Sequence, residues 1–228
     1  MENLSQVVEN YDRILEEVKS LSQGNATLVL ASKTVDQSIL KSLAKARPGV
    51  IFGENKVQEL IAKYFEADGL VWQFIGRLQT NKVKYIVDKV SLIQSVDSLR
   101  LAEEIEKRAG KIGKRMDILV EVNVGGEASK GGVEPDELLP LLSEIAKMPH
   151  LKVKGLMSVL PNADEAALAP CYALLKDLFE KAKAIEAPNF SIEILSAGMS
   201  GDYRFALQNG SNMVRIGSAV FGARSYAK

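Results

Sequence analysis

The sequence contains very little cysteine and histidine. One cysteine, Cys171, and one histidine, His150, occur among 228 residues. A single cysteine excludes an internal disulfide and favours a reducing compartment, so we expect a cytoplasmic protein. His150 follows a proline, which predicts a loop residue rather than an acid–base catalyst. No set of cysteines and histidines has zinc spacing, and a loop histidine does not support a Ser-His-Asp triad.

Net charge and long apolar runs are missing as well. Twenty-nine lysines and arginines balance 29 aspartates and glutamates, which leaves no electrostatic footprint for nucleic acid or an anionic membrane. No apolar run approaches the roughly 18 residues that a membrane span requires. The acidic, amphipathic N-terminus is unlike a signal peptide. We therefore expect partners that are neither nucleic acid nor membrane.

Eight short apolar runs, rich in β-branched residues, follow an amphipathic helix predicted near residues 4–21. The runs begin at Thr27, Val50, Leu70, Val90, Met116, Leu151, Phe190 and Ser211. Stretches with helix chemistry separate most of them. Asp97 is a good N-cap for one such helix, Pro140 is expected to tighten or kink another, and Asp202 and Gly210 bracket a third.

Alternation of strands and helices predicts parallel pairing through right-handed crossovers. Eight such units close a (β/α)8 TIM barrel, with the N-terminal helix as an addition. A doubly wound open sheet is the alternative. No linker, charge block or strong repeat divides the sequence, so we interpret residues 1–228 as a single domain.

Chemistry in such barrels collects at the C-terminal ends of the strands. Lys33 ends the first strand on the same face as Val29 and Ala31, so it can point into the barrel mouth. Small-residue turns at 197–201 and 217–218 follow the last two strands, where backbone amides at a helix start suit an anion. Each feature alone is more often a rim charge or ordinary loop geometry. Together they suggest a phosphorylated carbonyl compound held by an imine and by amides.

Six segments, in order along nearly the whole chain, resemble the pyridoxal-phosphate homeostasis proteins of the YggS/PROSC type. They are ASKT at 31–34, FGENKVQE at 52–59, WQFIGRLQTNK at 72–82, KGLMSV at 154–159, LSAGMSGDY at 195–203 and MVRIGSAVFGAR at 213–224. The resemblance implies a fold like the N-terminal barrel of alanine racemase. It also implies pyridoxal 5′-phosphate (PLP) as cofactor and a role in vitamin B6 homeostasis.

Matching positions imply specific roles in the site. Lys33 would form the Schiff base, Arg215 would face the pyridine nitrogen, and Asn55 would lie near the ring. The phosphate would be held by Ser200, Gly201, Gly217 and Ser218. Two residues depart from the family pattern, Gln73 in place of a common histidine and Arg77 in place of a common proline. We assign both to the third-strand turn, where they would alter the outer site.

Partial burial of Lys33 and the nearby Arg215 would favour the neutral, nucleophilic amine. An arginine beside the ring nitrogen would keep that nitrogen unprotonated and weaken the electron sink on which PLP enzymes depend. Asp202 is expected to turn away from the phosphate and cap the following helix. The loop at 125–132 is either a mobile lid, with Lys130 reaching a phosphate, or a flexible connection, and Cys171 is interpreted as a packing residue.

Two functions remain open. The first is a non-catalytic PLP-binding protein, acting as a monomer, that stores cofactor or supplies it to PLP-dependent apo-enzymes. The second is a PLP-dependent amino-acid racemase. Racemisation needs proton donors on both faces of the substrate carbon, and the racemases that this barrel resembles carry a second, β-rich domain. Only Lys33 is an obvious donor here, so we favour the binder.

Overall fold

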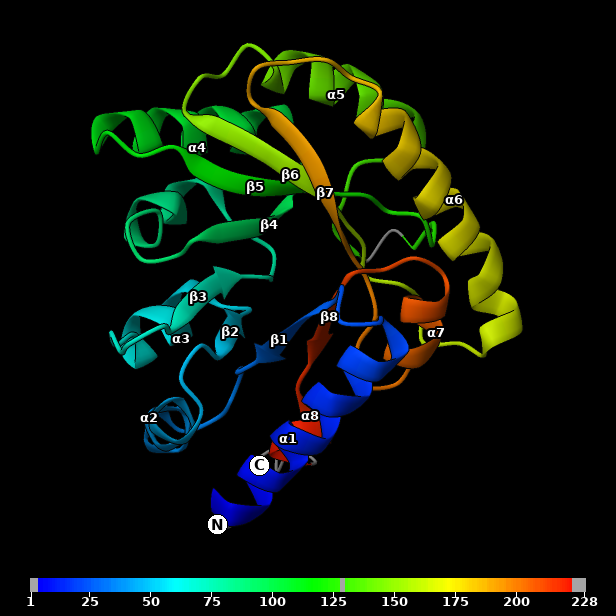
Figure 1. Ribbon diagram of the computed structural model, residues 1–228. Coiled ribbons are helices and arrows are strands. Elements are labelled where there is room, and N and C mark those ends of the chain that lie inside the picture. The colour runs from blue at the N-terminus through cyan, green and yellow to red at the C-terminus, as the bar shows by residue number, and fades with distance from the viewer. Residues whose placement is uncertain (1–3, 128–129, 223–228) are drawn as a thin grey trace.

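The computed structural model describes residues 4–127 and 130–222 and forms a closed parallel β-barrel (Figure 1). The strands are β1 (Thr27–Ala31), β2 (Ile51–Glu54), β3 (Val71–Phe74), β4 (Leu92–Val96), β5 (Met116–Glu121), β6 (Leu151–Met157), β7 (Phe190–Ser196) and β8 (Met213–Ile216). Each strand pairs with the next along the chain, and β8 closes the barrel by pairing with β1. The predicted TIM barrel is confirmed, and each predicted run contains one strand.

Helices surround the barrel on its outside (Figure 1). The α-helices are α1 (Leu4–Leu21), α2 (Gln37–Ala46), α3 (Val57–Lys63), α4 (Leu99–Lys111), α5 (Leu138–Ile145), α6 (Glu165–Lys183), α7 (Tyr203–Gln208) and α8 (Ser218–Phe221), and the 3-10 helices are η1 (Thr80–Tyr85) and η2 (Pro135–Glu137). The added helix α1 buries Val7, Ile14 and Val18. Its Asn10 side chain donates a 3.2 Å hydrogen bond to the carbonyl of Val220, so α1 lies beside α8.

Two predicted helix boundaries need correction or refinement. Ser98, not Asp97, is the N-cap of α4, and its hydroxyl donates to the Asp97 carboxylate instead of capping the helix. Pro140 lies in the first turn of α5, directly after the 3-10 helix η2. A proline is tolerated in a first turn because the amide that it lacks has no partner within the helix there. Between β3 and β4 the crossover is the 3-10 helix η1.

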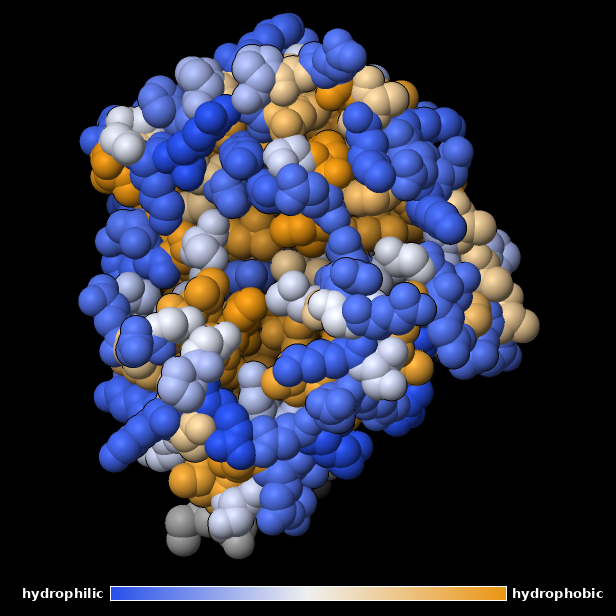
Figure 2. Space-filling view, in the orientation of Figure 1, coloured by the Kyte–Doolittle hydropathy of each residue, from blue (hydrophilic) through white to orange (hydrophobic). Residues whose placement is uncertain are grey.

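The apolar core has two parts. The larger part fills the space between the barrel and the helices, as expected for strands buried on both faces. The smaller part fills the barrel interior and consists of Val29, Ile75, Leu92, Leu119, Met157 and Met213. Buried polar side chains from several strands lie next to it, among them Gln73, Gln94, Ser196 and Arg215. On the face shown in Figure 2, apolar side chains appear in a hollow surrounded by a mostly hydrophilic rim.

Candidate cofactor site

Lys33 follows β1 at the mouth of the barrel. Val29 belongs to the inner apolar cluster and Ala31 packs against it. The strand ends at Ala31, so Lys33 does not end β1 as predicted but lies in the turn that the Val35 amide closes on the Ser32 carbonyl at 3.1 Å. The residue is half-buried. Strand β1 lies between β2 and β8, because Ala31 pairs with Gly53 and Leu30 pairs with Ile216. Residues that follow β1, β2 and β8 therefore share one sector of the rim.

The turns after β7 and β8 meet at this sector. The Ser200 hydroxyl accepts hydrogen bonds from the amides of Gly217 at 3.3 Å and Ala219 at 3.4 Å. The Arg215 amide donates to the Gly198 carbonyl at 3.0 Å, which ties the turn to β8. Gly201 and Ser218 are exposed. The structure thus brings the four predicted phosphate residues to one place, with a hydroxyl oxygen already accepting from two amides there.

Arg215 is a buried cation in the wall of the barrel. Its side chain is 4% exposed. One guanidinium nitrogen donates to the Ser196 hydroxyl at 2.7 Å and another to the Ser158 carbonyl at 2.8 Å. Burial lowers the pKa of Arg215 to about 10, against the attraction of the Glu121 and Asp202 carboxylates. The guanidinium is therefore charged at neutral pH.

Gln73 belongs to a buried network around Arg215. The Ser196 hydroxyl donates to the Gln94 side-chain oxygen at 2.7 Å, and the Gln94 amide donates to the Gln73 oxygen at 2.6 Å. The placement of Gln73 in the outer third-strand turn is wrong, since this residue is within β3 and 5% exposed. Arg77 is exposed at the rim, as expected. Of the two departures from the family pattern, Gln73 is therefore buried within a strand and Arg77 is exposed in the turn that follows it.

Asn55 begins the turn after β2. Its backbone amide donates to the Glu54 carboxylate at 2.9 Å. Its side-chain oxygen is buried and has no hydrogen-bond partner among the described residues. The backbone here approaches Gly76 so closely that a Cβ on that glycine would lie 2.2 Å from the Asn55 carbonyl oxygen. Since unpaired buried polar atoms are costly, the Asn55 oxygen is a candidate for a ligand contact.

Glu121, which the sequence interpretation missed, ends β5 as a buried carboxyl group. It is 5% exposed, and its carboxyl group forms no hydrogen bond or ion pair with the residues that the structure describes. Burial raises the pKa of Glu121 to about 7, and repulsion from Asp97 adds to this, while Arg215 and Arg77 oppose it. An acidic residue at the end of the apolar run MDILVE was the available signal.

Asp202 does not cap α7 through its side chain, contrary to the expectation. Its carboxylate instead accepts from the Met199 amide at 2.7 Å and from the Tyr172 hydroxyl at 2.7 Å. Burial, with the Asp202 charge adding to it, raises the pKa of Tyr172. The carboxylate is thereby held by the turn and by α6, because a local backbone amide and a buried hydroxyl compete successfully with the helix amides.

Three other residues from the sequence interpretation lie outside this sector. Lys130 donates to the Leu160 carbonyl at 2.7 Å, which anchors one end of its loop, and residues 128–129 of that loop lie outside the described residues. His150 precedes β6 and contacts Glu106 at 2.6 Å, as a loop residue. Cys171 packs on the core from α6, as expected.

Neither metal ligation nor membrane insertion is indicated by the described parts of the chain. Within residues 4–127 and 130–222, no group of three or more acidic, histidine or cysteine side chains is arranged to hold a metal ion. Across the same ranges, no helix has the length and apolar character needed to cross a membrane.

Comparison with known proteins places this barrel in a class. The family model described as "Alanine racemase, N-terminal domain" matches residues 3–225. A Clostridium difficile alanine racemase shares the fold, with a TM-score of 0.72 at 19% identity, and the match covers 96% of this chain but 58% of the racemase. The barrel is therefore of the alanine racemase N-terminal type.

Curated relatives narrow the assignment. A protein of Aquifex aeolicus named pyridoxal phosphate homeostasis protein is 41% identical over 99% of this chain and 98% of its own length. A protein of Pasteurella multocida with the same name is 34% identical over 100% and 98%. The chain belongs to the pyridoxal phosphate homeostasis protein family, which confirms the resemblance seen in the sequence.

Solved structures agree with this family. PipY of Synechococcus elongatus without PLP has a TM-score of 0.86 at 27% identity, covering 95% of this chain and 100% of PipY. The PLP-bound structure of the same protein gives a TM-score of 0.80 at 28% identity over the same shares.

Proposed function

We propose that this chain binds PLP on Lys33 and serves in PLP homeostasis rather than in catalysis. The observation that carries the proposal is the meeting of Lys33, Arg215 and the Ser200–Gly217 turn pair in one sector of the mouth. The names of the curated relatives and the PLP in a PipY structure support PLP as the ligand.

The described residues fit a phosphorylated pyridine aldehyde. The Ser200 hydroxyl hydrogen is a donor for a phosphate, with Gly201 and Ser218 beside it. The amides of Gly217 and Ala219, which donate to the Ser200 oxygen over 3.3 and 3.4 Å, could turn to a phosphate in its place. The unpartnered oxygen of Asn55 is an acceptor that a ligand or a bridging water can satisfy. Each predicted contact has a residue of suitable chemistry.

Lys33 would link the cofactor covalently. As a primary amine, Lys33 would hold the PLP aldehyde as an imine, with loss of one water. Lys33 is half-buried, in the sector of the mouth that also holds Arg215. PLP supplies an aldehyde and an electron sink when bound, and a charged arginine facing its ring nitrogen would weaken that sink. Restrained chemistry of this kind suits storage better than turnover.

The broader biological role follows from this chemistry. As a single domain over residues 1–228, acting as a cytoplasmic monomer, the chain would hold PLP safely and release it to PLP-dependent apo-enzymes. The reversible C=N bond suits such exchange, because water or an incoming amine can replace Lys33.

The absorption spectrum tests the proposal directly. The purified protein with PLP should show an imine band that borohydride abolishes, leaving the cofactor fixed to the peptide that contains Lys33. Lys33→Ala should lose the band yet keep part of its affinity through the phosphate contacts. Reduction that labels Lys56 or Lys130 instead would sink the assignment.

A further inference from the structure

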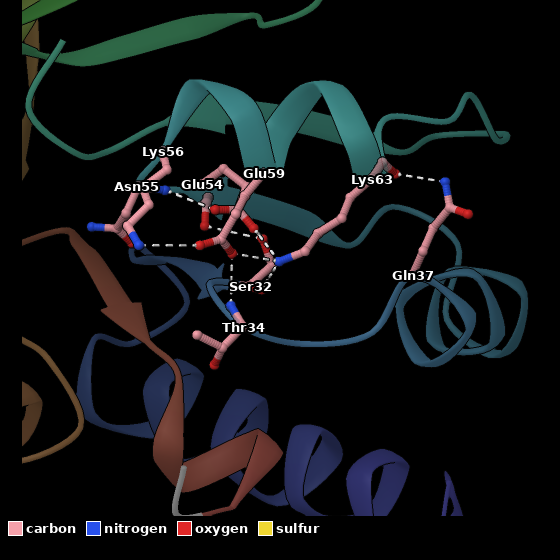
Figure 3. Close-up of polar contacts among 9 residues, drawn as sticks. Ser32, Thr34, Gln37, Glu54, Asn55, Lys56, Glu59 and Lys63 are labelled. Atoms are coloured by element: carbon pink, nitrogen blue, oxygen red, sulfur yellow. Dashed lines mark hydrogen bonds and ion pairs between the residues drawn. The ribbon is translucent and has the colours of Figure 1, made fainter. Parts of the chain in front are cut away.

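A cluster of charged residues lies beside the turn that carries Lys33 (Figure 3). The Lys63 ammonium, at the C-terminal end of α3, donates to the Glu54 carboxylate at 2.9 Å and to the Glu59 carboxylate at 2.8 Å. The Lys63 and Glu54 side chains are only 12% and 0% exposed, and the Glu59 side chain is 23% exposed. These charges are largely withdrawn from water, so their mutual contacts are weakly screened.

The cluster holds the backbone on both sides of Lys33. Lys63 also donates to the Ser32 carbonyl at 3.1 Å, just before Lys33. Glu59 accepts from the Thr34 amide at 2.8 Å, just after it. Glu54 completes the contact by accepting from the Ser32 hydroxyl at 3.0 Å. The peptide units flanking Lys33 are thus fixed by side chains from β2 and α3.

Thr34 has an unusual backbone conformation. Its φ is 66°, in the left-handed region, where a β-branched residue is an outlier. Such conformations are unfavourable by themselves and persist only where the surroundings impose them. Two described contacts hold it: the bond from the Thr34 amide to Glu59, and the turn bond from the Val35 amide to the Ser32 carbonyl at 3.1 Å. Strain at this point sets the direction in which the chain leaves Lys33.

Stability alone does not account for the cluster. Withdrawing charges from water is costly, and buried ion pairs often contribute little net stability. The Gln37 amide adds a 3.1 Å bond to the Lys63 carbonyl, which fixes the end of α3 relative to α2 (Figure 3). The shared target of the three charged side chains is the short segment 32–34.

We propose that Glu59, Lys63 and Glu54 are positioning residues that hold Lys33 for attack on the PLP aldehyde. The inference rests on the proposed function, since it concerns the lysine that forms the bond. Because the peptide units on both sides are fixed, the Lys33 backbone has one conformation. The side-chain nitrogen of Lys33 can therefore reach fewer positions than on a mobile turn. The cluster acts through Lys33 and needs no contact with the cofactor.

Glu59→Leu is the principal test, because it removes the acceptor of the Thr34 amide at a position that is partly exposed. Glu59→Gln keeps an oxygen at that place and should restore most of the effect. Glu104→Leu is the matched control, since Glu104 is 20% exposed and pairs with Arg108 in the same i,i+4 arrangement on α4. Each variant is made with Lys33 present and in a Lys33→Ala chain, and PLP affinity is measured at equilibrium.

With Lys33 present, Glu59→Leu should weaken PLP binding about tenfold, which corresponds to about 1.4 kcal/mol of coupling. In the Lys33→Ala chain the same change should have almost no effect, because only phosphate and ring contacts remain. In the protein without PLP, hydrogen exchange at the Thr34 amide should accelerate in Glu59→Leu and stay slow in Glu59→Gln and Glu104→Leu.

Equal weakening in both backgrounds would overturn the inference, as general damage to the fold. Unchanged affinity with Lys33 present would overturn it as well. If Lys33→Ala alone leaves the imine band and the PLP affinity intact, the proposed function is wrong. That result differs from both outcomes above, so the two failures can be told apart. If Glu59→Leu does not fold, Lys63→Met is the alternative variant. It removes the bond from Lys63 to the Ser32 carbonyl, and we expect the same pattern of PLP affinities.

Discussion

Arg215 on β8 donates a 2.7 Å hydrogen bond to the hydroxyl of Ser196 on the neighbouring strand β7. Ser196 in turn donates to Gln94, so the arginine is held by a chain of buried polar groups. A guanidinium has five N–H donors, and the two bonds to described residues leave others for a ligand. Arg215 is therefore a fixed cation whose remaining donors are available at the site.

Replacing Arg215 should change the ring chemistry more than the fold. Arg215→Met removes the cation that we expect at the pyridine nitrogen, so the pKa of that nitrogen in bound PLP should rise. The free energy of unfolding should fall by about 1–3 kcal/mol, because the buried Ser158 carbonyl loses its hydrogen-bond donor. The 15N shift of labelled PLP, followed over pH, reports the protonation.

Arg115→Met is the matched control, since Arg115 is exposed and donates to the Pro188 carbonyl away from the site. It should leave the 15N shift of bound PLP unchanged. If the nitrogen titrates identically in Arg215→Met and in the unaltered protein, Arg215 does not face it.

The buried carboxyl of Glu121 should make stability depend on pH. Its pKa is raised by burial to about 7 from 4.5, so the folded state favours the protonated form. The contribution of Glu121 to the free energy of unfolding, without PLP, should therefore be most favourable below pH 4.5. It should fall as the pH rises from 4.5 to 7. The loss is at most about 3.5 kcal/mol, since each pKa unit corresponds to about 1.4 kcal/mol.

Glu121→Gln should abolish this loss, because the amide has no charge to bury. Urea unfolding at pH 5 and pH 8 would show a smaller difference between the two pH values than in the unaltered protein. Glu186→Gln, at an exposed position, serves as control and should keep the full difference. A Glu121→Gln variant with the unaltered pH dependence would contradict the assignment.

Much of the architecture could be predicted because the strands follow from short apolar runs in the sequence. Each strand coincides with an apolar run, and the end of the first run places Lys33 in the turn after β1, while the direction of its side chain stays a prediction. The buried networks could not be predicted in this way. Ser196 and Gln94 lie 102 residues apart, and only closure of the barrel brings them together.

The Glu59–Lys63 pair was visible as an i,i+4 spacing, but its role was not. The contacts from these side chains to Thr34 and Ser32 depend on how α3 packs beside β1, which no local pattern encodes. The N-cap at Ser98 shows the same limit on a smaller scale. Asp97 and Ser98 are both good caps by residue type, and the backbone geometry after β4 decides between them.

The protein should not racemise amino acids at enzymatic rates. Racemisation requires a proton donor on each face of the substrate carbon, and we assign only Lys33 to one face. Alanine incubated with the PLP-loaded protein should keep its chirality in polarimetry or in a coupled D-amino-acid assay. Racemisation of alanine at about 10 s⁻¹, a typical enzymatic rate, would instead support a racemase.

Phosphate recognition should be separable from formation of the C=N bond. The Ser200 hydroxyl and the amides of Gly217 and Ala219 already form one cluster of polar groups. Charge-assisted hydrogen bonds contribute roughly 1.5–3 kcal/mol each, and about 1.4 kcal/mol is tenfold in affinity. Losing two such bonds should weaken binding by at least about a hundredfold. Unphosphorylated pyridoxal should therefore bind that much more weakly than PLP, although both aldehydes can react with Lys33.

Ser200→Ala and Ser218→Ala should each remove part of this discrimination and leave the part that backbone amides supply. Ser143→Ala is a suitable control, because the exposed Ser143 hydroxyl donates to the Leu139 carbonyl within α5. Equilibrium titrations of pyridoxal and PLP with each variant, at one pH and one salt concentration, give the two affinities and their ratio. A ratio near one in the unaltered protein would place the phosphate site elsewhere. A ratio unchanged by both serine substitutions would assign the recognition to the amides of Gly217 and Ala219 alone.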